Sequence, residues 1–136
     1  MSEDRELEDI KRKMLSRIIS KQKQSTILQP GIVTVITEMN FDQAISTSSP
    51  LLADFWADWC MPCKMMAPII ESLAKDYKDR VYFAKINVDE NQSIALRYGV
   101  RSIPNFILFK NGKVMDQLIG AIGRQRIEAS IVKHLG

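Results

Sequence analysis

The 136-residue sequence has few thiol and imidazole side chains: it contains two cysteines and one histidine. A closed structural zinc site needs four ligands, and the histidine, His134, is about seventy residues from the nearer cysteine. Zinc bound within one chain is therefore disfavoured, and a site bridging two chains would need a symmetric dimer. We expect no metal and no other cofactor.

Long apolar runs and a strong charge of one sign are also missing. No run approaches the ~20 residues of a membrane-spanning helix, and the net charge is only +3. The basic residues are not interleaved with aromatic ones, so we expect no nucleic-acid partner. The chain begins with acidic residues where a secretory signal needs basic and then apolar ones. We therefore expect a cytoplasmic, reducing location, where a close cysteine pair is more often redox-active or metal-binding than structural.

By composition the chain divides into an N-terminal extension, residues 1–30, and a single domain, residues 31–136. The extension is rich in charge and has no aromatic residue. Its apolar residues follow the spacing of an amphipathic helix: Leu7, Ile10, Met14 and Ile18. Residues 20–30 are typical of a linker that ends at a Pro-Gly breaker.

The apolar stripe of the extension has several possible partners. It could pack on its own domain, dimerise, bind another protein or touch an anionic membrane surface. The extension could equally be a solubilising tail, because isolated helices of this length are marginal in water. The sequence leaves the oligomeric state open.

The domain alternates strand and helix patterns. Apolar and β-branched runs predict five strands: residues 32–36, 51–57, 81–88, 106–110 and 113–119. Helical periodicity predicts four helices: residues 41–45, capped by Asn40, and residues 62–77, 92–98 and 124–135. We expect Asp89 to cap the third helix, Pro68 to kink the second, and Asn111-Gly112 to join the last two strands as a hairpin. The order predicts an α/β domain, a mixed sheet with helices on both faces.

Both cysteines lie in Cys60-Met61-Pro62-Cys63, between a predicted buried strand and a predicted helix. A helix N-terminus carries unpaired N–H groups and about half a positive charge, which favour a thiolate. Residues three apart on a helix face the same way, so Cys63 can reach Cys60. We expect Cys60 to be the more exposed and more acidic thiol, which attacks a disulfide that Cys63 then resolves. A purely structural disulfide is a weaker interpretation, because so short a loop restrains little entropy.

The run Asp54-Phe55-Trp56-Ala57-Asp58-Trp59-Cys60-Met61-Pro62-Cys63-Lys64 resembles the active-site segment of the thioredoxin family. The similarity extends in order over residues 32–136. Further segments carry it: Ala67-Pro68, residues 85–89, residues 98–104 and residues 109–112. The resemblance implies the thioredoxin fold.

The resemblance also implies roles for individual residues. Cys60 would be the nucleophile and Cys63 the resolving thiol. Asp54 would be a buried carboxylate that helps to deprotonate Cys63, directly or through a water, with Lys85 nearby; from the sequence alone, an aspartate facing water is as good an interpretation. The substrate would meet residues around the pair: Trp59, Met61, Pro62, Ile103, a cis Pro104, Gly120 and Ala121.

The sequence departs from the family pattern at three places. Met61 stands where glycine is typical, and it adds a flexible apolar side chain beside the cysteines. Asn105 stands where threonine is common. The N-terminal extension has no counterpart in minimal members.

The activity implied is the reduction of protein disulfides, with a reductase of the thioredoxin-reductase type as electron donor. Two alternatives remain open at this point. The protein could be a dedicated redox partner or binding module whose client is chosen by the extension, or it could work as a disulfide isomerase or oxidase.

Overall fold

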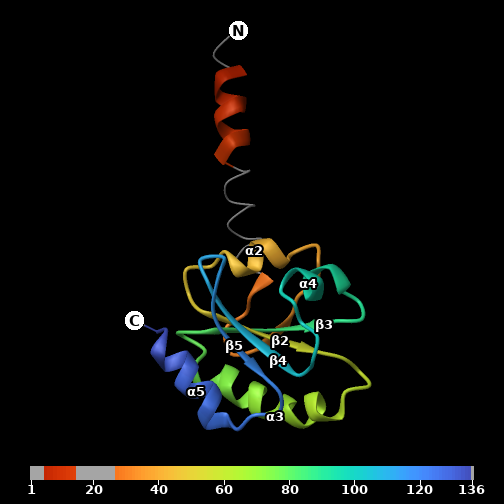
Figure 1. The fold of residues 1–136 in the computed structure, drawn as a ribbon. Helices are drawn as coiled ribbons and strands as arrows, with labels where there is room; N and C mark the ends of the chain where they lie inside the picture. Colours follow the sequence, from red (N-terminus) through yellow and green to blue (C-terminus); the bar gives the residue numbers. More distant parts are fainter. Residues whose placement is uncertain (1–4, 15–26, 136) are drawn as a thin grey trace.

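The computed structural model describes residues 5–14 and 27–135, and within them the domain is built on one mixed sheet (Figure 1). The described strands lie in the order β1-β3-β2-β4-β5. Their bounds are β1 Val33–Val35, β2 Leu51–Trp56, β3 Tyr82–Asn87, β4 Asn105–Lys110 and β5 Lys113–Ile119. Strand β3 is parallel to both β1 and β2, whereas β4 runs antiparallel to β2 and β5 antiparallel to β4. The predicted mixed sheet is confirmed.

Helices cover both faces of the sheet (Figure 1). Helices α3, Met61–Asp76, and α5, Arg124–Lys133, lie on one face. Helices α2, Phe41–Ile45, and α4, Gln92–Arg97, lie on the other. Strand β2 is central, and its residues 51–55 are all buried. Because successive side chains of a strand point to opposite faces, Phe55 packs in the core beneath α2 and α4, and Leu52 packs against α3.

Alternation along β2 places Asp54 on the α3 face. Leu52 is on that face, where it shares a core cluster with Met66 and Ile70 of α3. Asp54 is two residues further along the strand, so its side chain points the same way. The carboxyl group therefore lies between the sheet and the helix that begins at the cysteines.

The predicted turn chemistry is confirmed at the hairpin and wrong at helix α4. Asn111 and Gly112 both have positive φ, 54° and 78°, as a tight hairpin turn requires. Helix α4 has Asn91 at its N-cap position, not Asp89. The reason is a local turn, in which Asn87 Oδ1 accepts hydrogen bonds from the backbone N–H groups of Asp89 and Glu90. Pro68 lies within α3, and the kink expected there stays a prediction.

Residues 5–14 form a helix, as the apolar spacing predicted. All ten of its side chains are exposed, and its apolar residues are more than half exposed: Leu7, Ile10 and Met14. Ile18 and most of the expected linker lie outside the described residues. Leu28, which the sequence assigned to the linker, is only 6% exposed and belongs to the core cluster beneath α2. Packed structure therefore begins before position 31, because the apolar Leu28 fills a site in that core.

None of the helices in residues 5–14 and 27–135 is long and apolar enough to cross a bilayer.

Candidate active site

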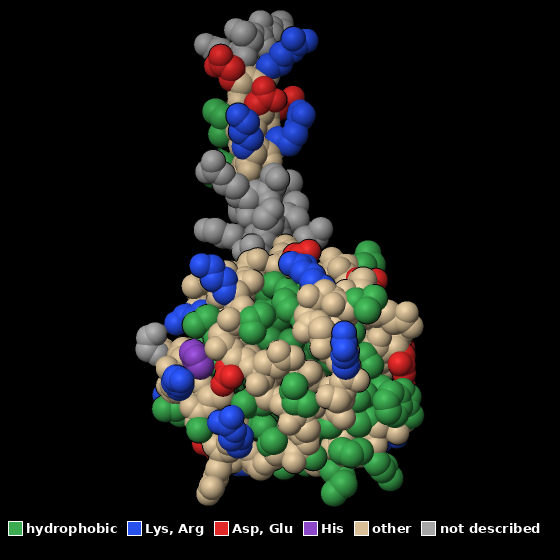
Figure 2. Space-filling model, in the orientation of Figure 1, with side chains coloured by type: hydrophobic (Ala, Val, Ile, Leu, Met, Phe, Trp, Pro, Cys, Tyr) green, Lys and Arg blue, Asp and Glu red, His purple; other side chains and the backbone are tan. Residues whose placement is uncertain are grey.

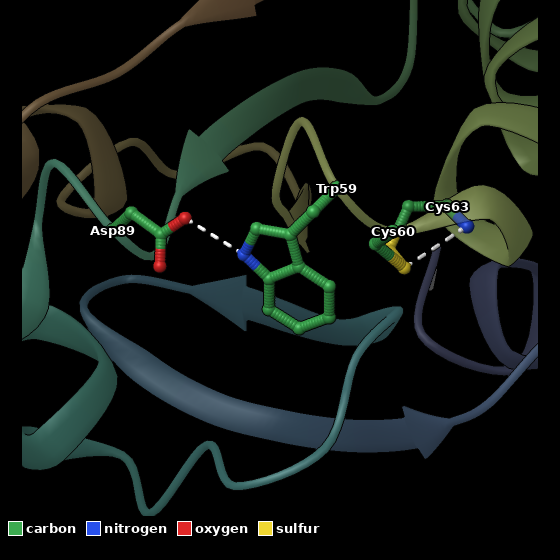
Figure 3. The surroundings of a disulfide bond; sticks show 4 residues. All are labelled: Trp59, Cys60, Cys63 and Asp89. Atoms are coloured by element: carbon green, nitrogen blue, oxygen red, sulfur yellow. Dashed lines mark hydrogen bonds between the residues drawn. A yellow bond between two sulfur atoms is a disulfide. The ribbon is translucent and has the colours of Figure 1, made fainter.

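The two cysteines form a disulfide at the start of helix α3 (Figure 3). Their Cα atoms are 5.3 Å apart. Cys60 is the N-cap residue of α3, and its Sγ accepts a hydrogen bond of 3.2 Å from the backbone N–H of Cys63. Pro62 stands in the first turn, where its missing N–H costs no helical hydrogen bond. The predicted pairing of the cysteines is thus seen directly.

This geometry favours a thiolate at Cys60 over one at Cys63. The first backbone N–H groups of a helix lack intrahelical partners, and one of them already points at Cys60 Sγ. Such a donor, together with the positive end of the helix, stabilises negative charge on sulfur. The expected difference in exposure is not seen in the disulfide form, because Cys60 is 4% exposed and Cys63 is 3%. Both residues pack in one small cluster with Ala57, and partly buried Ile103 covers them.

Asp54 is a buried carboxyl group on the face of the sheet that carries α3. The residue is 6% exposed, so the alternative of an aspartate facing water is wrong. Within the described part of the chain, its Oδ1 has no hydrogen-bond partner. Burial raises the pKa of Asp54 from its ordinary 3.8 to about 7, and the charge of Lys85 opposes that rise. A carboxyl with this pKa can both accept and release a proton near neutrality.

Lys85 lies beside Asp54 across two parallel strands. The two residues are register partners between β2 and β3. The Lys85 side chain is half-buried, and its Nζ lies 5.3 Å from the ring centroid of Trp56. The ammonium is therefore held near the carboxyl by an aromatic face and not by a direct ion pair.

The loop before β4 reaches the cysteines from the other side. The Ile103-Pro104 peptide bond is cis, and Ile103 packs against the cysteine cluster. The carbonyl of Pro104 accepts a 2.8 Å hydrogen bond from the backbone N–H of Gly120. This bond brings the segment after β5, which includes exposed Ala121, beside the loop. Three segments far apart in the sequence therefore meet around the disulfide.

Large apolar side chains are exposed next to Cys60. Trp59 is 70% exposed and Met61 69%, and Pro62 is also exposed. Further along α3, Met65 is 75% exposed. In Figure 2, hydrophobic side chains gather at several places on the surface of the domain. Solvent-exposed apolar groups beside a reactive pair are suited to hold an extended peptide.

The sequence did not point to Asp89 as a partner of this site. Its Oδ2 accepts a 2.8 Å hydrogen bond from the Trp59 indole N–H (Figure 3). A signal was present, since the carboxyl ends of parallel strands meet at one edge of a sheet. Trp59 follows β2 and Asp89 follows the neighbouring β3. Of Lys85 and Asp89, the two charged residues of the motif at positions 85–89, only Asp89 is joined to the residues beside Cys60 by a hydrogen bond.

The described residues contain no group of three or more His, Cys, Asp and Glu side chains that could hold a metal ion.

A family model described as Thioredoxin matches residues 32–133. The thioredoxin of Chlorobaculum thiosulfatiphilum is 46% identical over 101 residues, which cover 74% of this chain and 94% of the relative. The thioredoxin of Alicyclobacillus acidocaldarius is 48% identical over 100 residues, covering 74% and 95% respectively. Among solved structures, a mutant thioredoxin from Halobacterium salinarum superposes with a TM-score of 0.74 at 34% identity, over 79% of this chain and 95% of that one. The Malassezia sympodialis thioredoxin Mala s 13 gives a TM-score of 0.71 at 38% identity, over 76% and 91%.

Proposed function

Because this chain belongs to the thioredoxin family, and is therefore a thiol-disulfide oxidoreductase that reduces protein disulfides, we propose that Asp54 is the base of its dithiol. We further propose that the surface around Trp59 and Ile103 receives the client.

The reaction proceeds through a mixed disulfide at Cys60. The Cys60 thiolate attacks a client disulfide and one client sulfur leaves as a thiolate. Cys63 then attacks Cys60 Sγ, which forms the intramolecular disulfide and releases the second client sulfur. The 3.2 Å hydrogen bond from the Cys63 N–H to Cys60 Sγ is the observation that supports Cys60 as the attacking thiol, because the donor would stabilise that thiolate.

Resolution needs a base, since Cys63 must lose its proton before it can attack. Two features of the structure support Asp54 in that role: it is buried, and it lies on the α3 face. Its burial raises its pKa to about 7. A carboxyl at its ordinary pKa of 3.8 would be a much weaker proton acceptor. Lys85 would act through Asp54, by limiting how far burial raises its pKa.

The docking face would combine residues from three segments: Trp59, Met61, Pro62, Ile103, Pro104, Gly120 and Ala121. An extended client would pair with the backbone at Ile103 and lie against the exposed Trp59 and Met61 side chains. Met61 would widen the apolar contact, because methionine is flexible and polarizable.

The partners would be protein disulfides and, as electron donor, a reductase of the thioredoxin-reductase type. Such a cycle would transport electrons to clients and maintain redox balance in the cytoplasm. The oxidised form that the structure records is the species that the donor would reduce.

Reduction of insulin with dithiothreitol as donor tests the activity. We expect the intact chain to accelerate insulin precipitation and the Cys60→Ser variant to match the uncatalysed rate. Equal rates for the two proteins would contradict the assignment. A measured reduction potential separates reductase work from isomerase or oxidase work, because thioredoxin lies near −270 mV and dedicated oxidants near −120 mV.

A further inference from the structure

A pocket of about 250 Å³ opens between helix α3 and the edge of the sheet at β1. Its walls are mainly apolar, formed by Ile32 and Val33 on one side and by Ala67 and Ile70 of α3 on the other. Charged residues lie around it, and Asp54 is one of its lining residues. The pocket is large enough for several water molecules, each of which occupies about 30 Å³ in the liquid.

The carboxyl group of Asp54 needs a hydrogen-bond partner that the described residues do not supply. Asp54 Oδ1 is buried and makes no hydrogen bond to any described residue. Buried polar atoms almost always have a partner, either protein or ordered water. Because Asp54 lines the pocket, water there lies next to its side chain, and a small rotation of the carboxyl group would bring Oδ1 within reach of that donor.

The pocket is separate from the proposed docking face. Its α3 residues are Ala67, Ile70, Glu71 and Lys75, in the middle of the helix, whereas the cysteines are at its N-terminal end. None of the residues proposed to meet the client lines it. A client that covers the cysteines therefore leaves the pocket open to solvent.

We propose that this pocket is the port through which Asp54 exchanges its proton with water while a client is attached to Cys60. The proposal rests on the role of Asp54 as base. In the resolving step the Asp54 carboxylate takes the proton of the Cys63 thiol, and the Cys63 thiolate attacks Cys60 Sγ. The Cys60–Cys63 bond forms, the bond from Cys60 to the client breaks, and the client sulfur leaves as a thiolate that water protonates. Asp54 then releases its proton to water in the pocket.

The charges around the port come from two elements. Lys85 of β3 lowers the pKa of Asp54, and Glu71 and Lys75 of α3 add one charge of each sign. The β1 side, residues 31–33, contributes no charged side chain. Water in the pocket solvates the carboxylate, so a side chain that displaces it should deepen the desolvation that already raises the pKa.

Filling the pocket tests the proposal directly. Ala67→Leu places a larger apolar side chain in the wall, and Ala129→Leu makes the same change at an exposed position of α5 as the matched control. Both are made in a Cys63→Ser background with a peptide attached to Cys60 by a disulfide. The Asp54 carboxyl is then titrated by ¹³C NMR with and without the peptide.

We expect the peptide to leave the Asp54 midpoint nearly unchanged. Ala67→Leu should raise it by about one pH unit, and Ala129→Leu should not move it. Two results would overturn the proposal that the pocket is the port. In the first, attaching the peptide raises the titration midpoint of Asp54 as much as Ala67→Leu does. In the second, Ala67→Leu leaves that midpoint unchanged. Val33→Phe fills the pocket from the opposite wall and replaces Ala67→Leu if that variant does not fold.

A kinetic measurement separates the port from the base. When the reduced protein meets 5,5′-dithiobis(2-nitrobenzoate), Cys60 releases one thionitrobenzoate and Cys63 releases the second. A titration midpoint of Asp54 that is one pH unit higher lowers the ionised fraction of its carboxyl group at pH 7 about fivefold. In Ala67→Leu we therefore expect the second thionitrobenzoate to be released about fivefold more slowly, and the first at an unchanged rate. If Asp54→Asn leaves the rate of the second release unchanged, the assignment of Asp54 as the base is wrong. If Asp54→Asn slows the second release but Ala67→Leu and Val33→Phe do not, only the proposed role of the pocket is wrong.

Discussion

The indole Nε1 of Trp59 donates a 2.8 Å hydrogen bond to Oδ2 of Asp89 (Figure 3). The two residues follow different strands, Trp59 after β2 and Asp89 after β3. The Trp59 side chain is 70% exposed, so few packing contacts are available to fix its ring. We infer that this hydrogen bond holds the ring in one orientation beside Cys60.

Replacing the Asp89 carboxyl should weaken client binding and leave the chemistry of the sulfurs intact. In Asp89→Ala the Trp59 ring loses its acceptor, so ordering it costs more when a client docks. We expect KM for insulin to rise about two- to fivefold, which is roughly 0.4–1 kcal/mol and lies at the lower end of what one hydrogen bond contributes. The rate with a small aromatic disulfide, which needs little docking, should change much less.

Asp89→Asn is the matched control, because it keeps an acceptor oxygen at the same place. It should recover most of the wild-type KM. Equal KM values for Asp89→Ala and the wild type would show that the orientation of Trp59 does not matter for docking.

Asp54→Asn should make the oxidised protein more stable at neutral pH. The pKa of Asp54 is raised from 3.8 to about 7 in the folded state, so the folded protein binds the proton more tightly than the unfolded chain. Protonation of Asp54 therefore adds to the free energy of unfolding. This contribution is fully present below pH 3.8 and is lost as the pH rises toward 7. A difference of this size corresponds to at most roughly 4 kcal/mol.

Urea unfolding of both proteins from pH 4 to pH 8 measures this effect. The stability advantage of Asp54→Asn should be near zero at pH 4, grow as the pH rises, and level off above pH 7. Because asparagine is nearly the same size as aspartate, packing should change little. An advantage that does not depend on pH would contradict the desolvation argument.

Met61→Gly should narrow the range of clients. The Met61 side chain is 69% exposed in the first turn of α3, where it can lie along an apolar peptide. Removing it deletes that contact without changing the Cys63 N–H that points at Cys60 Sγ. We expect kcat/KM to fall about three- to tenfold for a peptide disulfide flanked by leucine, which corresponds to roughly 1 kcal/mol of lost apolar contact.

A peptide disulfide flanked by aspartate supplies the comparison, since it should lose much less. Met61→Leu is the control variant, because it keeps an apolar side chain of similar volume. If both peptides lose activity equally, Met61 acts on the cysteines and not on the docking surface.

The sequence predicted the parts of the fold that depend on local rules. The position of Cys60 at a helix start follows from an apolar run followed by a helical period, and the hairpin at Asn111-Gly112 follows from the need for positive φ. The sequence pattern is compatible with Asp89 either as the N-cap of a helix or as part of a turn. In the structure Asp89 is in a turn, because its backbone N–H donates a hydrogen bond to the Asn87 side chain.

The part of the site that could not be predicted is tertiary. The burial of Asp54 is compatible with its apolar strand but not required by it, because an edge strand would expose the same residue. The hydrogen bond from Trp59 to Asp89 depends on β2 and β3 being neighbours; the order of the elements indicates that both strands are parallel but not which side chains meet at their ends. The pocket beside Asp54 depends on how α3 packs against β1, and the sequence of neither segment indicates this packing.

The boundary between extension and domain gives the last prediction. Leu28 is 6% exposed and packs in the core beneath α2, and Ile27 packs partly against the same cluster. The helix at residues 5–14, by contrast, has only exposed side chains. A chain that begins at Ile27 should therefore unfold in urea with the same free energy as the full chain, within about 0.5 kcal/mol, and should reduce insulin at the same rate.

Leu28→Ala in the full chain should cost about 2–4 kcal/mol, because it leaves a cavity in a packed core. If the shortened chain loses as much stability as Leu28→Ala does, the extension packs on the domain and a boundary just before Ile27 is wrong. If the shortened chain keeps its stability but reduces insulin more slowly, the exposed helix contributes to the choice of client.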